Sequence, residues 1–246
     1  MPVAPVVPVV RNFVCVIFCL LERTRWRIKR LLDIYMDVSY HLTSQARVCD
    51  SKDRNCMRKS KQEAAVTRQH IIKAAAEEFR KNGIAGTGLS DLMAAAGLTH
   101  GGFYRHFDSK DQIVAEACTA AAESLAEQLA ASASKKSPPR GLKTIVEKYL
   151  SAAHRDEPAD GCPVAALGSE IARGDERTRA AATQGFLKFV EIIASQFGKT
   201  RPDLARRRAL VAAATMIGAL TMSRIVTDSE LSADILREAE RQLINS

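Results

Sequence analysis

Residues 97–107 read GLTHGGFYRHF, and this stretch decides how the whole chain is interpreted. Two adjacent glycines and three aromatic residues weaken an isolated helix, yet strongly helical patterns lie on both sides of them. Such a composition suits a short helix that its neighbours hold in place while its outer side meets another molecule. The alternative is an ordinary tight turn that packs against the core.

Four helices are predicted around this stretch. Their expected ranges are 68–83, 90–97, 100–107 and 110–131. A Ser or Thr stands at each start, and a glycine ends the first two helices. These residues are Thr67, Ser90, Thr99 and Ser109 at the starts, and Gly83 and Gly97 at the ends. Two short helices joined by a turn that contains glycine form a helix-turn-helix, whose second helix enters the major groove of DNA.

This arrangement gives each unusual residue a role. Phe103 and Phe107 are four residues apart and therefore anchor one face of the third helix to the core. Gly101 and Gly102 remove side chains where the backbone comes close to DNA. The polar and cationic side chains around them suit phosphates and base edges. The candidate DNA contacts are Arg68, Thr87, Ser90, Thr99, His100, Gly101, Gly102, Tyr104, His106 and Lys110.

The positive charge of the chain is unevenly distributed. Of the formal net charge of +8, residues 1–56 and 57–110 contribute +4 each, whereas residues 111–246 carry 18 basic and 18 acidic residues. A clustered positive field attracts a polyanion, and a balanced surface does not. Double-stranded DNA is therefore the expected partner of the first half, and the second half has another task.

The stretch from Thr67 to about Ala117 resembles the DNA-binding domain of the TetR family of bacterial transcriptional regulators. The matching features are a helix that ends FRKNG, the small-residue turn AAAGLT, the FYRHF motif and the following SKDQI. Met93 departs from the family, which more often has alanine there.

The resemblance implies an all-α protein with a three-helix DNA-binding domain over 57–110 and a larger helical domain over 111–246. The larger domain would bind an inducer and dimerise, and the whole would act as a repressor. The resemblance also assigns roles at the motif. The residues implied to contact DNA are Thr99, His100, Gly102 and Tyr104, and those implied to hold the backbone are His106 and Lys110.

Residues 1–56 differ from the rest and are expected to be a non-native or disordered extension before a true start at Met57. They hold four of the six cysteines, the only Trp and a nine-residue apolar run that is too short to span a bilayer. Charged residues follow this run, which is unlike a secretory signal. The alternative is a basic amphipathic arm that associates with membranes, as RWRIKRLLDIY would allow.

Composition and cysteine spacing narrow the class of protein. An Ala-rich chain with few aromatic residues and little β-branched alternation favours helices. Six cysteines without a CxxC pair or Cys/His spacing predict neither a disulfide framework nor a zinc site, and they favour a reducing cytoplasm. No catalytic motif occurs, so neither an enzyme nor a cofactor is expected. His154, near Asp156 and Asp160, is interpreted as part of a polar surface turn.

Residues 111–246 are predicted to continue in helices after a loop at about 131–141. The helix over about 204–226 contains the run ALVAAATMIGALTMSRIV, which is apolar or small around most of its circumference and indicates a partner on its outer side. With the last helix it is expected to form a four-helix bundle in a homodimer, as a pseudo-palindromic operator requires. The alternative is a central core helix within one subunit.

Cys162 stands directly before Pro163 and is expected at a helix N-terminus. The positive end of the helix dipole lowers the pKa of a thiol, which would suit a sensor of electrophiles or oxidants. The surrounding DGCPVAALGSE is similar to a motif in a TetR subgroup that includes such sensors. The alternative is a small buried apolar residue that caps a turn.

Release from DNA by a small-molecule inducer is the other predicted route. Its pocket is expected between the helices of the second half, although the same side chains could form a filled core. The predicted lining residues are Leu150, Leu167, Phe186, Phe189 and Met216. A competing function is an architectural DNA-binding protein without ligand control, but this would leave the neutral second half without a task.

Overall fold

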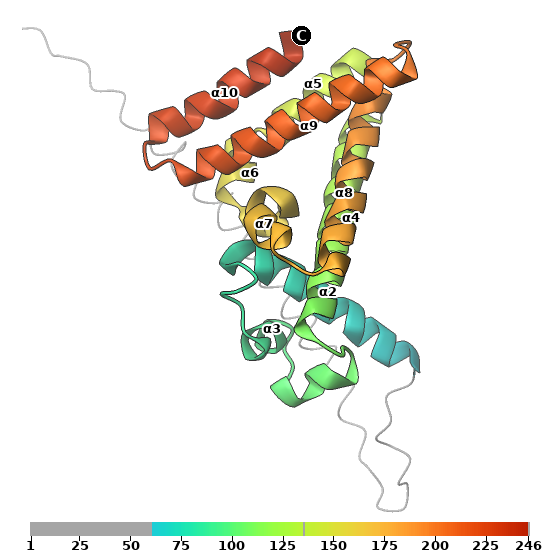
Figure 1. Cartoon of the computed structure of the whole chain (residues 1–246), viewed down its shortest axis with the longest axis vertical. Helices are drawn as coiled ribbons and strands as arrows, with labels where there is room; N and C mark the ends of the chain where they lie inside the picture. The colour runs from blue at the N-terminus through green and yellow to red at the C-terminus, as the bar shows by residue number, and fades with distance from the viewer. Residues whose placement is uncertain (1–60, 135, 246) are drawn as a thin grey trace, which may run out of the picture. The chain divides into compact units, whose positions relative to one another are not determined.

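The computed structural model describes residues 61–134 and 136–245 (Figure 1). These two ranges contain nine α-helices and three short 3-10 helices, and no strand. The predicted all-α fold is therefore confirmed. The predictions about residues 1–56 and about a start at Met57 lie outside the described residues.

The first elements form the helix-turn-helix end of the chain. They are α2 (Lys61–Asn82), α3 (Leu89–Ala95), η1 (His100–Arg105) and α4 (Lys110–Ala133). Gly83 and Gly97 follow the first two helices with φ angles of 80° and 66°, a backbone conformation that costs glycine little. Ser109 caps α4 by accepting a hydrogen bond from the Gln112 amide at 3.1 Å. Both glycine terminators and this cap are as predicted.

The other predicted helix starts differ from the structure. α2 begins upstream of Thr67, whose hydroxyl donates to the Glu63 carbonyl at 2.8 Å within the helix, so Thr67 is not an N-cap. α3 begins after Gly88, one residue before Ser90. Thr99 precedes η1, but its side chain makes no capping bond and the element is a 3-10 helix. A six-residue element with two glycines has little to favour the wider α winding.

The remaining elements form the larger, second half. They are α5 (Pro138–Tyr149), α6 (Ala152–Asp156), η2 (Pro158–Asp160), α7 (Pro163–Ala172), α8 (Glu176–Ala194), η3 (Ser195–Phe197), α9 (Pro202–Ile225) and α10 (Ser229–Asn245). The loop predicted over about 131–141 is shorter than expected, because α4 continues to Ala133 and α5 begins at Pro138. Prolines fit the first turn of a helix, where no amide is needed.

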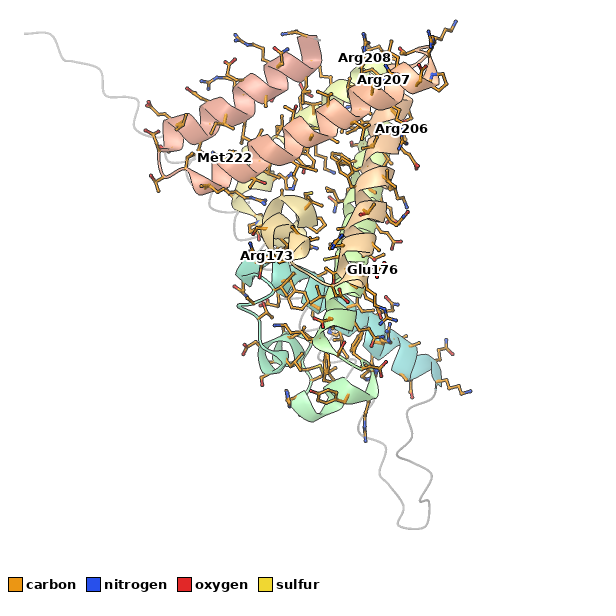
Figure 2. The ribbon with its side chains drawn as sticks, in the orientation of Figure 1. Arg173, Glu176, Arg206, Arg207, Arg208 and Met222 are labelled. Atoms are coloured by element: carbon orange, nitrogen blue, oxygen red, sulfur yellow. The ribbon has the colours of Figure 1, made fainter. Side chains whose placement is uncertain are left out.

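α9 is packed on one side and exposed on another. Its buried residues are Ala205, Ala209, Ala212, Ala213, Met216, Leu220 and Ser223. Val211, Met222 and Ile225 are 65%, 48% and 64% exposed. Figure 2 labels Met222 on α9. By length and apolar composition alone, α9 is the one described helix that could cross a membrane. A third of its apolar window is buried, on the side that packs against α8 and α10.

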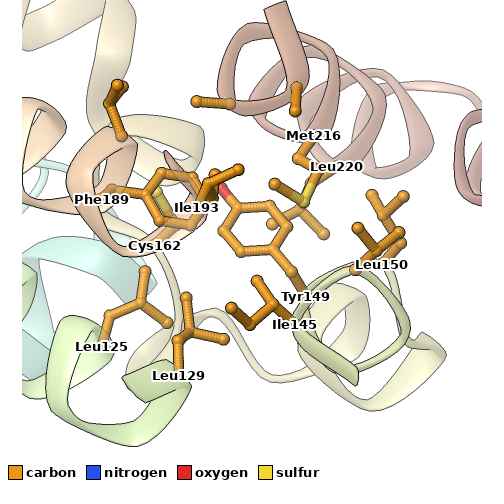
Figure 3. Packing of buried hydrophobic residues seen from close by; sticks show 14 of the residues in the cluster. Leu125, Leu129, Ile145, Tyr149, Leu150, Cys162, Phe189, Ile193, Met216 and Leu220 are labelled. Carbon is orange, nitrogen blue, oxygen red and sulfur yellow. The ribbon is translucent and has the colours of Figure 1, made fainter. Parts of the chain in front are cut away.

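Two hydrophobic cores share two helices, α4 and α7. The helix-turn-helix core contains buried residues of α2, α3, η1 and the first half of α4, and it continues past residue 110 as far as Ala121. The C-terminal core contains buried residues of α4, α5 and α7 to α10 (Figure 3). α7 contributes Leu167 and Ile171 to the first core and Ala165 to the second. The predicted domain boundary at residue 110 therefore does not coincide with a gap between the cores.

Candidate nucleic-acid interface

The helix-turn-helix core fixes α3 and η1 relative to each other. Phe103 and Phe107 are 0% and 1% exposed, and their rings stack with centroids 5.5 Å apart. Leu92 and Met93 supply the apolar surface of α3 in the same core. Because both aromatic anchors of η1 point inward, the opposite side of this element lies at the protein surface.

Half of the ten predicted contact residues are exposed. Tyr104 is 66% exposed, and its ring meets the Phe103 ring edge-on at 5.2 Å. Arg105, which ends η1, is also exposed and adds a cation that sequence reasoning did not single out, although it stands inside the FYRHF motif. The other predicted contacts that are exposed are Ser90, Thr99, His100 and Gly101.

The glycine pair of η1 is not required by packing within the described chain. A Cβ atom at Gly101 would meet no atom within 4 Å, and the φ angle of this residue is not positive. A Cβ atom at Gly102 would lie 3.5 Å from the Met93 methyl group, which is an ordinary contact distance. Neither crowding nor strain explains the pair, whereas the predicted close approach of a DNA backbone would explain it.

Arg68 is engaged inside the protein. Its guanidinium pairs with the Glu116 carboxylate at 2.6 Å, donates to the His106 carbonyl at 3.2 Å and lies 4.6 Å from the centre of the Phe107 ring. The hydrogen bond from Arg68 lowers the pKa of Glu116. Arg68 thus joins α2, α4 and the end of η1, so the structure gives it a supporting place instead of the predicted direct contact.

The turn between α2 and α3 is held by three side chains. Thr87 is 1% exposed and its hydroxyl donates to the Gly83 carbonyl at 2.7 Å, so the prediction that it contacts DNA is wrong. The Lys110 ammonium donates to the Ile84 carbonyl at 2.6 Å, a contact inside the protein, and its predicted contact with a DNA phosphate stays a prediction. Glu170 of α7 accepts from two amides of the same turn at 3.1 and 2.8 Å.

An apolar cavity of about 20 Å³ lies between α4, α7, α8 and α9. This volume is close to that of a single water molecule. Its walls include Cys118, Cys162, Val164, Phe186, Phe189 and Ile217. The predicted lining residues Phe186 and Phe189 are among them.

Three other predicted lining residues lie elsewhere. Leu150 and Met216 are 3% and 0% exposed within the C-terminal core, and Leu167 is 3% exposed within the helix-turn-helix core. Each is buried, as its apolar character predicts, but each packs against filled surroundings. A hydrophobic pattern identifies the buried face of a helix and does not identify which neighbour that face meets.

Cys162 is the N-cap residue of α7, as expected, but its thiol is buried. Burial raises the pKa of this thiol, and smaller opposing effects come from Tyr149 and from the backbone at the start of α7. The helix terminus does not compensate for the loss of water, so the predicted lowering of the pKa is wrong. Cys118 is a second buried free thiol on the cavity, and burial raises its pKa to about 11.

His154 is partly buried and connects the end of α5 to the start of α7 through hydrogen bonds, so it is not part of a polar surface turn. Its Nδ1 donates to the Tyr149 carbonyl at 2.7 Å, which leaves Nε2 to accept from the Cys162 amide at 3.0 Å. Burial lowers the pKa of His154 to about 4, so the ring is neutral at physiological pH. A Cβ atom at Gly161 would lie 2.6 Å from Nε2, which explains the glycine of DGCP.

Three buried polar atoms lack hydrogen-bond partners within the described residues, and they belong to Arg80, Tyr149 and Arg224. The Tyr149 ring stacks on Phe189 at 5.2 Å, and its hydroxyl is directed towards Phe189 and Cys162 (Figure 3). Arg224 donates to the carbonyls of residues 154 and 155, but its Nη1 atom has no partner. Unsatisfied buried groups of this kind cost about 1–3 kcal/mol each.

Arg80 connects the helix-turn-helix core to the segment that leads to Cys162. It is 8% exposed, and its guanidinium donates to the Ala159 carbonyl through Nε at 2.7 Å and through Nη2. Burial lowers the pKa of Arg80, and the nearby Asp160 partly opposes this effect. The sequence analysis did not predict this link. The one sign of it in the sequence is that Arg80 follows the apolar positions 72 and 76 at four-residue spacing, which places it on the buried face of α2.

Comparison with known proteins places these features in context. The family description "Bacterial regulatory proteins, tetR family" matches residues 71–117, and "Transcriptional regulator LmrA/YxaF-like, C-terminal domain" matches residues 138–242. The chain is 44% identical over 59 residues to the HTH-type transcriptional regulator AcrR of Shigella flexneri, which covers 24% of this chain and 27% of AcrR. The chain thus spans about a quarter of that relative.

A longer match has lower identity. The HTH-type transcriptional regulator LmrA of Bacillus subtilis is 24% identical over 156 residues, which covers 63% of this chain and 81% of LmrA. These relatives are regulators, in agreement with the expectation that the chain is not an enzyme.

Solved structures extend the likeness to the fold. A TetR transcriptional regulator from Chloroflexus aurantiacus is 30% identical, covers 75% of this chain and 95% of its own, and has a TM-score of 0.63. Reduced NemR of E. coli has the same TM-score at 20% identity, and it covers 73% of this chain and 96% of its own. AibR, crystallised with isovaleryl coenzyme A and operator DNA, has a TM-score of 0.53 at 17% identity. The match covers 72% of this chain and 98% of the AibR chain.

Proposed function

The chain belongs to the tetR family of bacterial regulatory proteins, and from this premise we propose that it represses transcription by binding operator DNA through α3 and η1. The observation that carries the proposal is the outer side of η1, where Tyr104 and His100 are exposed while Phe103 and Phe107 anchor the element from within. Hydroxyl and imidazole groups on a fixed short helix suit phosphates and base edges. Such a repressor works in the bacterial cytoplasm, on double-stranded DNA.

We assign homodimerisation to α9 and α10. The exposed apolar side chains of Val211, Met222 and Ile225 on α9 continue in Leu231 of α10, which is 49% exposed. A Cβ atom at Gly218 would meet nothing within 4 Å, so a partner helix can approach closely there. Covering this surface in a two-fold dimer would present two η1 elements to a pseudo-palindromic operator.

We assign inducer binding to the apolar cavity beside α7. A cavity of about 20 Å³ is too small for an organic ligand, so a ligand must displace α7 or α8 to enter. α7 also carries Glu170, which holds the turn before α3, so its displacement would reach the DNA-binding surface. A ligand that binds the displaced arrangement more tightly would release DNA. The raised thiol pKa of Cys162 favours non-covalent binding over thiol modification.

Fluorescence anisotropy with the full chain tests the DNA-binding proposal. The probe is DNA from immediately upstream of the chain's own gene, with a scrambled duplex beside it at two salt concentrations. The wild type is expected to prefer the upstream DNA by at least about 10³-fold, and both affinities should fall with added salt. His100→Ala/Tyr104→Ala should lose most of the preference, whereas the exposed α4 variant Thr119→Ala should keep it. Equal weak binding of wild type to both duplexes would instead support the architectural function.

A further inference from the structure

A strongly basic surface lies at the end of the second half that is farthest from η1. The segments 134–143 and 196–208 carry four and five Lys or Arg residues against a single acidic residue, Asp203, although residues 111–246 as a whole are neutral. The described cations of these segments are all exposed, and together they are called the distal basic surface. They are Lys136, Arg140, Lys143, Lys199, Arg201, Arg206, Arg207 and Arg208.

The fold brings the two segments together. A Cβ atom at Gly198 would lie 3.6 Å from the Pro138 side chain, so the start of α5 meets the connection between η3 and α9. The Arg208 guanidinium lies 5.9 Å from the centre of the Phe197 ring in that connection. Figure 2 shows Arg206, Arg207 and Arg208 at the opposite end of α4 and α8 from α3. The 24 residues of α4 separate this end from η1 by about 36 Å.

The described neighbours leave most of this charge unpaired. Arg201 pairs with Asp203 at 3.0 Å, and Lys143 pairs with Glu147 at 3.7 Å. Exposed ion pairs of this kind contribute little free energy, so both cations can exchange these partners for others. Among the described residues, no ion pair involves Arg140, Lys199, Arg206 or Arg207. The surface therefore carries a net positive field into solvent.

Helix stability does not explain these cations. α5 and α9 both begin at this surface, and the N-terminal end of a helix carries a positive partial charge that disfavours nearby cations. The first turn of α5 has no acidic residue and contains Arg140, and the first turn of α9 has one acidic residue, Asp203, which pairs with Arg201. The local electrostatics are therefore unfavourable in the free protein, and an anionic partner would relieve them.

We propose that the distal basic surface binds the phosphate backbone of a second DNA duplex. A protein partner would require an apolar centre, but Leu204 is the only large apolar side chain of these described segments that is exposed. Arginine, which makes up five of the eight cations, matches phosphate oxygens with two donors at once. A molecule seated on one duplex through η1 thereby holds another duplex, so the bridging rests on the proposed function.

A two-duplex capture experiment with the full chain tests this proposal. One random-sequence duplex of about 30 base pairs is fixed to beads, and a fluorescent duplex of the same kind is captured only when the protein bridges them. Wild type should capture the second duplex at low salt, and capture should fall steeply as salt is raised. Arg140→Gln/Arg206→Gln/Arg207→Gln should reduce capture at least about tenfold, since three phosphate contacts lower the salt exponent by about 2.7.

A charge-matched variant separates this site from a general loss of charge. Arg173→Gln/Arg179→Gln/Lys188→Gln removes three cations that are also exposed, one just after α7 and two on α8, and it should capture the second duplex as wild type does. Equal capture by wild type and the distal variant, or equal losses in both variants, would overturn the proposal. Polyglutamate is then added as a competitor. If it displaces the duplex only when its total negative charge is in large excess over that of the DNA, the surface recognises phosphate. If the surface binds polyglutamate in preference to DNA, the proposal is overturned.

A failure of the proposed function gives a different result. If η1 does not bind DNA, His100→Ala/Tyr104→Ala should bind a single random duplex as wild type does. The distal surface still predicts that this residual binding depends on salt and disappears when the three distal arginines are also replaced. Residual binding that survives their replacement would overturn the distal site, whatever the role of η1.

Discussion

The two hydrophobic cores of this protein differ in how completely side chains fill the space between their helices. The helix-turn-helix core is filled by aromatic and aliphatic side chains, with Phe103 and Phe107 almost fully buried. The C-terminal core supplies most of the wall of a cavity, to which Cys118 and Ile171 of the helix-turn-helix core also contribute, and it encloses the partly unsatisfied guanidinium of Arg224. A filled core holds a recognition surface in one arrangement, whereas a core with a void and unsatisfied polar groups loses less when it rearranges. This difference fits the proposal that the chain binds DNA at one end and responds to a ligand at the other.

The largest expected effect tests the filling of the first core. Phe103→Ala should lower the free energy of unfolding by about 3–5 kcal/mol, because it leaves a cavity in close-packed surroundings. Phe186→Ala should cost clearly less, because Phe186 is only partly buried and already borders a void. Chemical denaturation of both variants measures the difference. Equal losses would show that the two cores are equally well packed.

Acidification probes the second core through His154. The folded-state pKa of about 4 lies below the ordinary value of 6.5, so the unfolded chain takes up a proton first as the pH falls. The stabilisation is complete above pH 6.5 and is progressively lost towards pH 4. Between pH 7 and pH 5 the free energy of unfolding should fall by about 2 kcal/mol from this residue.

His154→Gln is the control for that prediction. It keeps a side chain that can hydrogen-bond and removes the ionisation, so its unfolding free energy should vary less over the same interval. Urea denaturation at pH 7, 6 and 5 provides the comparison. Parallel pH profiles for wild type and variant would place the pH dependence on other residues.

The smallest expected effect tests the void itself. Val164→Ile adds one methylene at the cavity wall, and it should change the free energy of unfolding by less than about 1 kcal/mol. Val146→Ile adds the same group at a fully buried position of the same core and should cost about 1–3 kcal/mol through overpacking. Thermal and chemical denaturation compare the pair. A larger cost at Val164 than at Val146 would mean that the cavity does not accept a side chain.

Sequence reasoning worked best where a local rule fixes the answer. Gly83, Gly97 and the Ser109 cap end or begin their helices as predicted, because each depends on a few neighbouring residues. It failed where an answer depends on distant neighbours. The burial of Cys162 comes from helices far along the chain, and Leu167 and Met216 pack against partners that a helical period cannot identify. Thr87 is a local exception, because its hydroxyl turns back to the carbonyl of Gly83 four residues earlier and the side chain is buried.

The sharing of α7 also bears on how such proteins can be recombined. Leu167, Ile171 and Glu170 of this one helix complete the helix-turn-helix core and the turn before α3. A fragment cut after α4 would leave that apolar surface open to water, so it should be prone to aggregation. A hybrid that takes its DNA specificity from this chain and its ligand response from a relative would therefore have to inherit α7 with the DNA-reading end, or redesign its inward face. DNA binding and ligand response would therefore have to be exchanged between relatives together with α7.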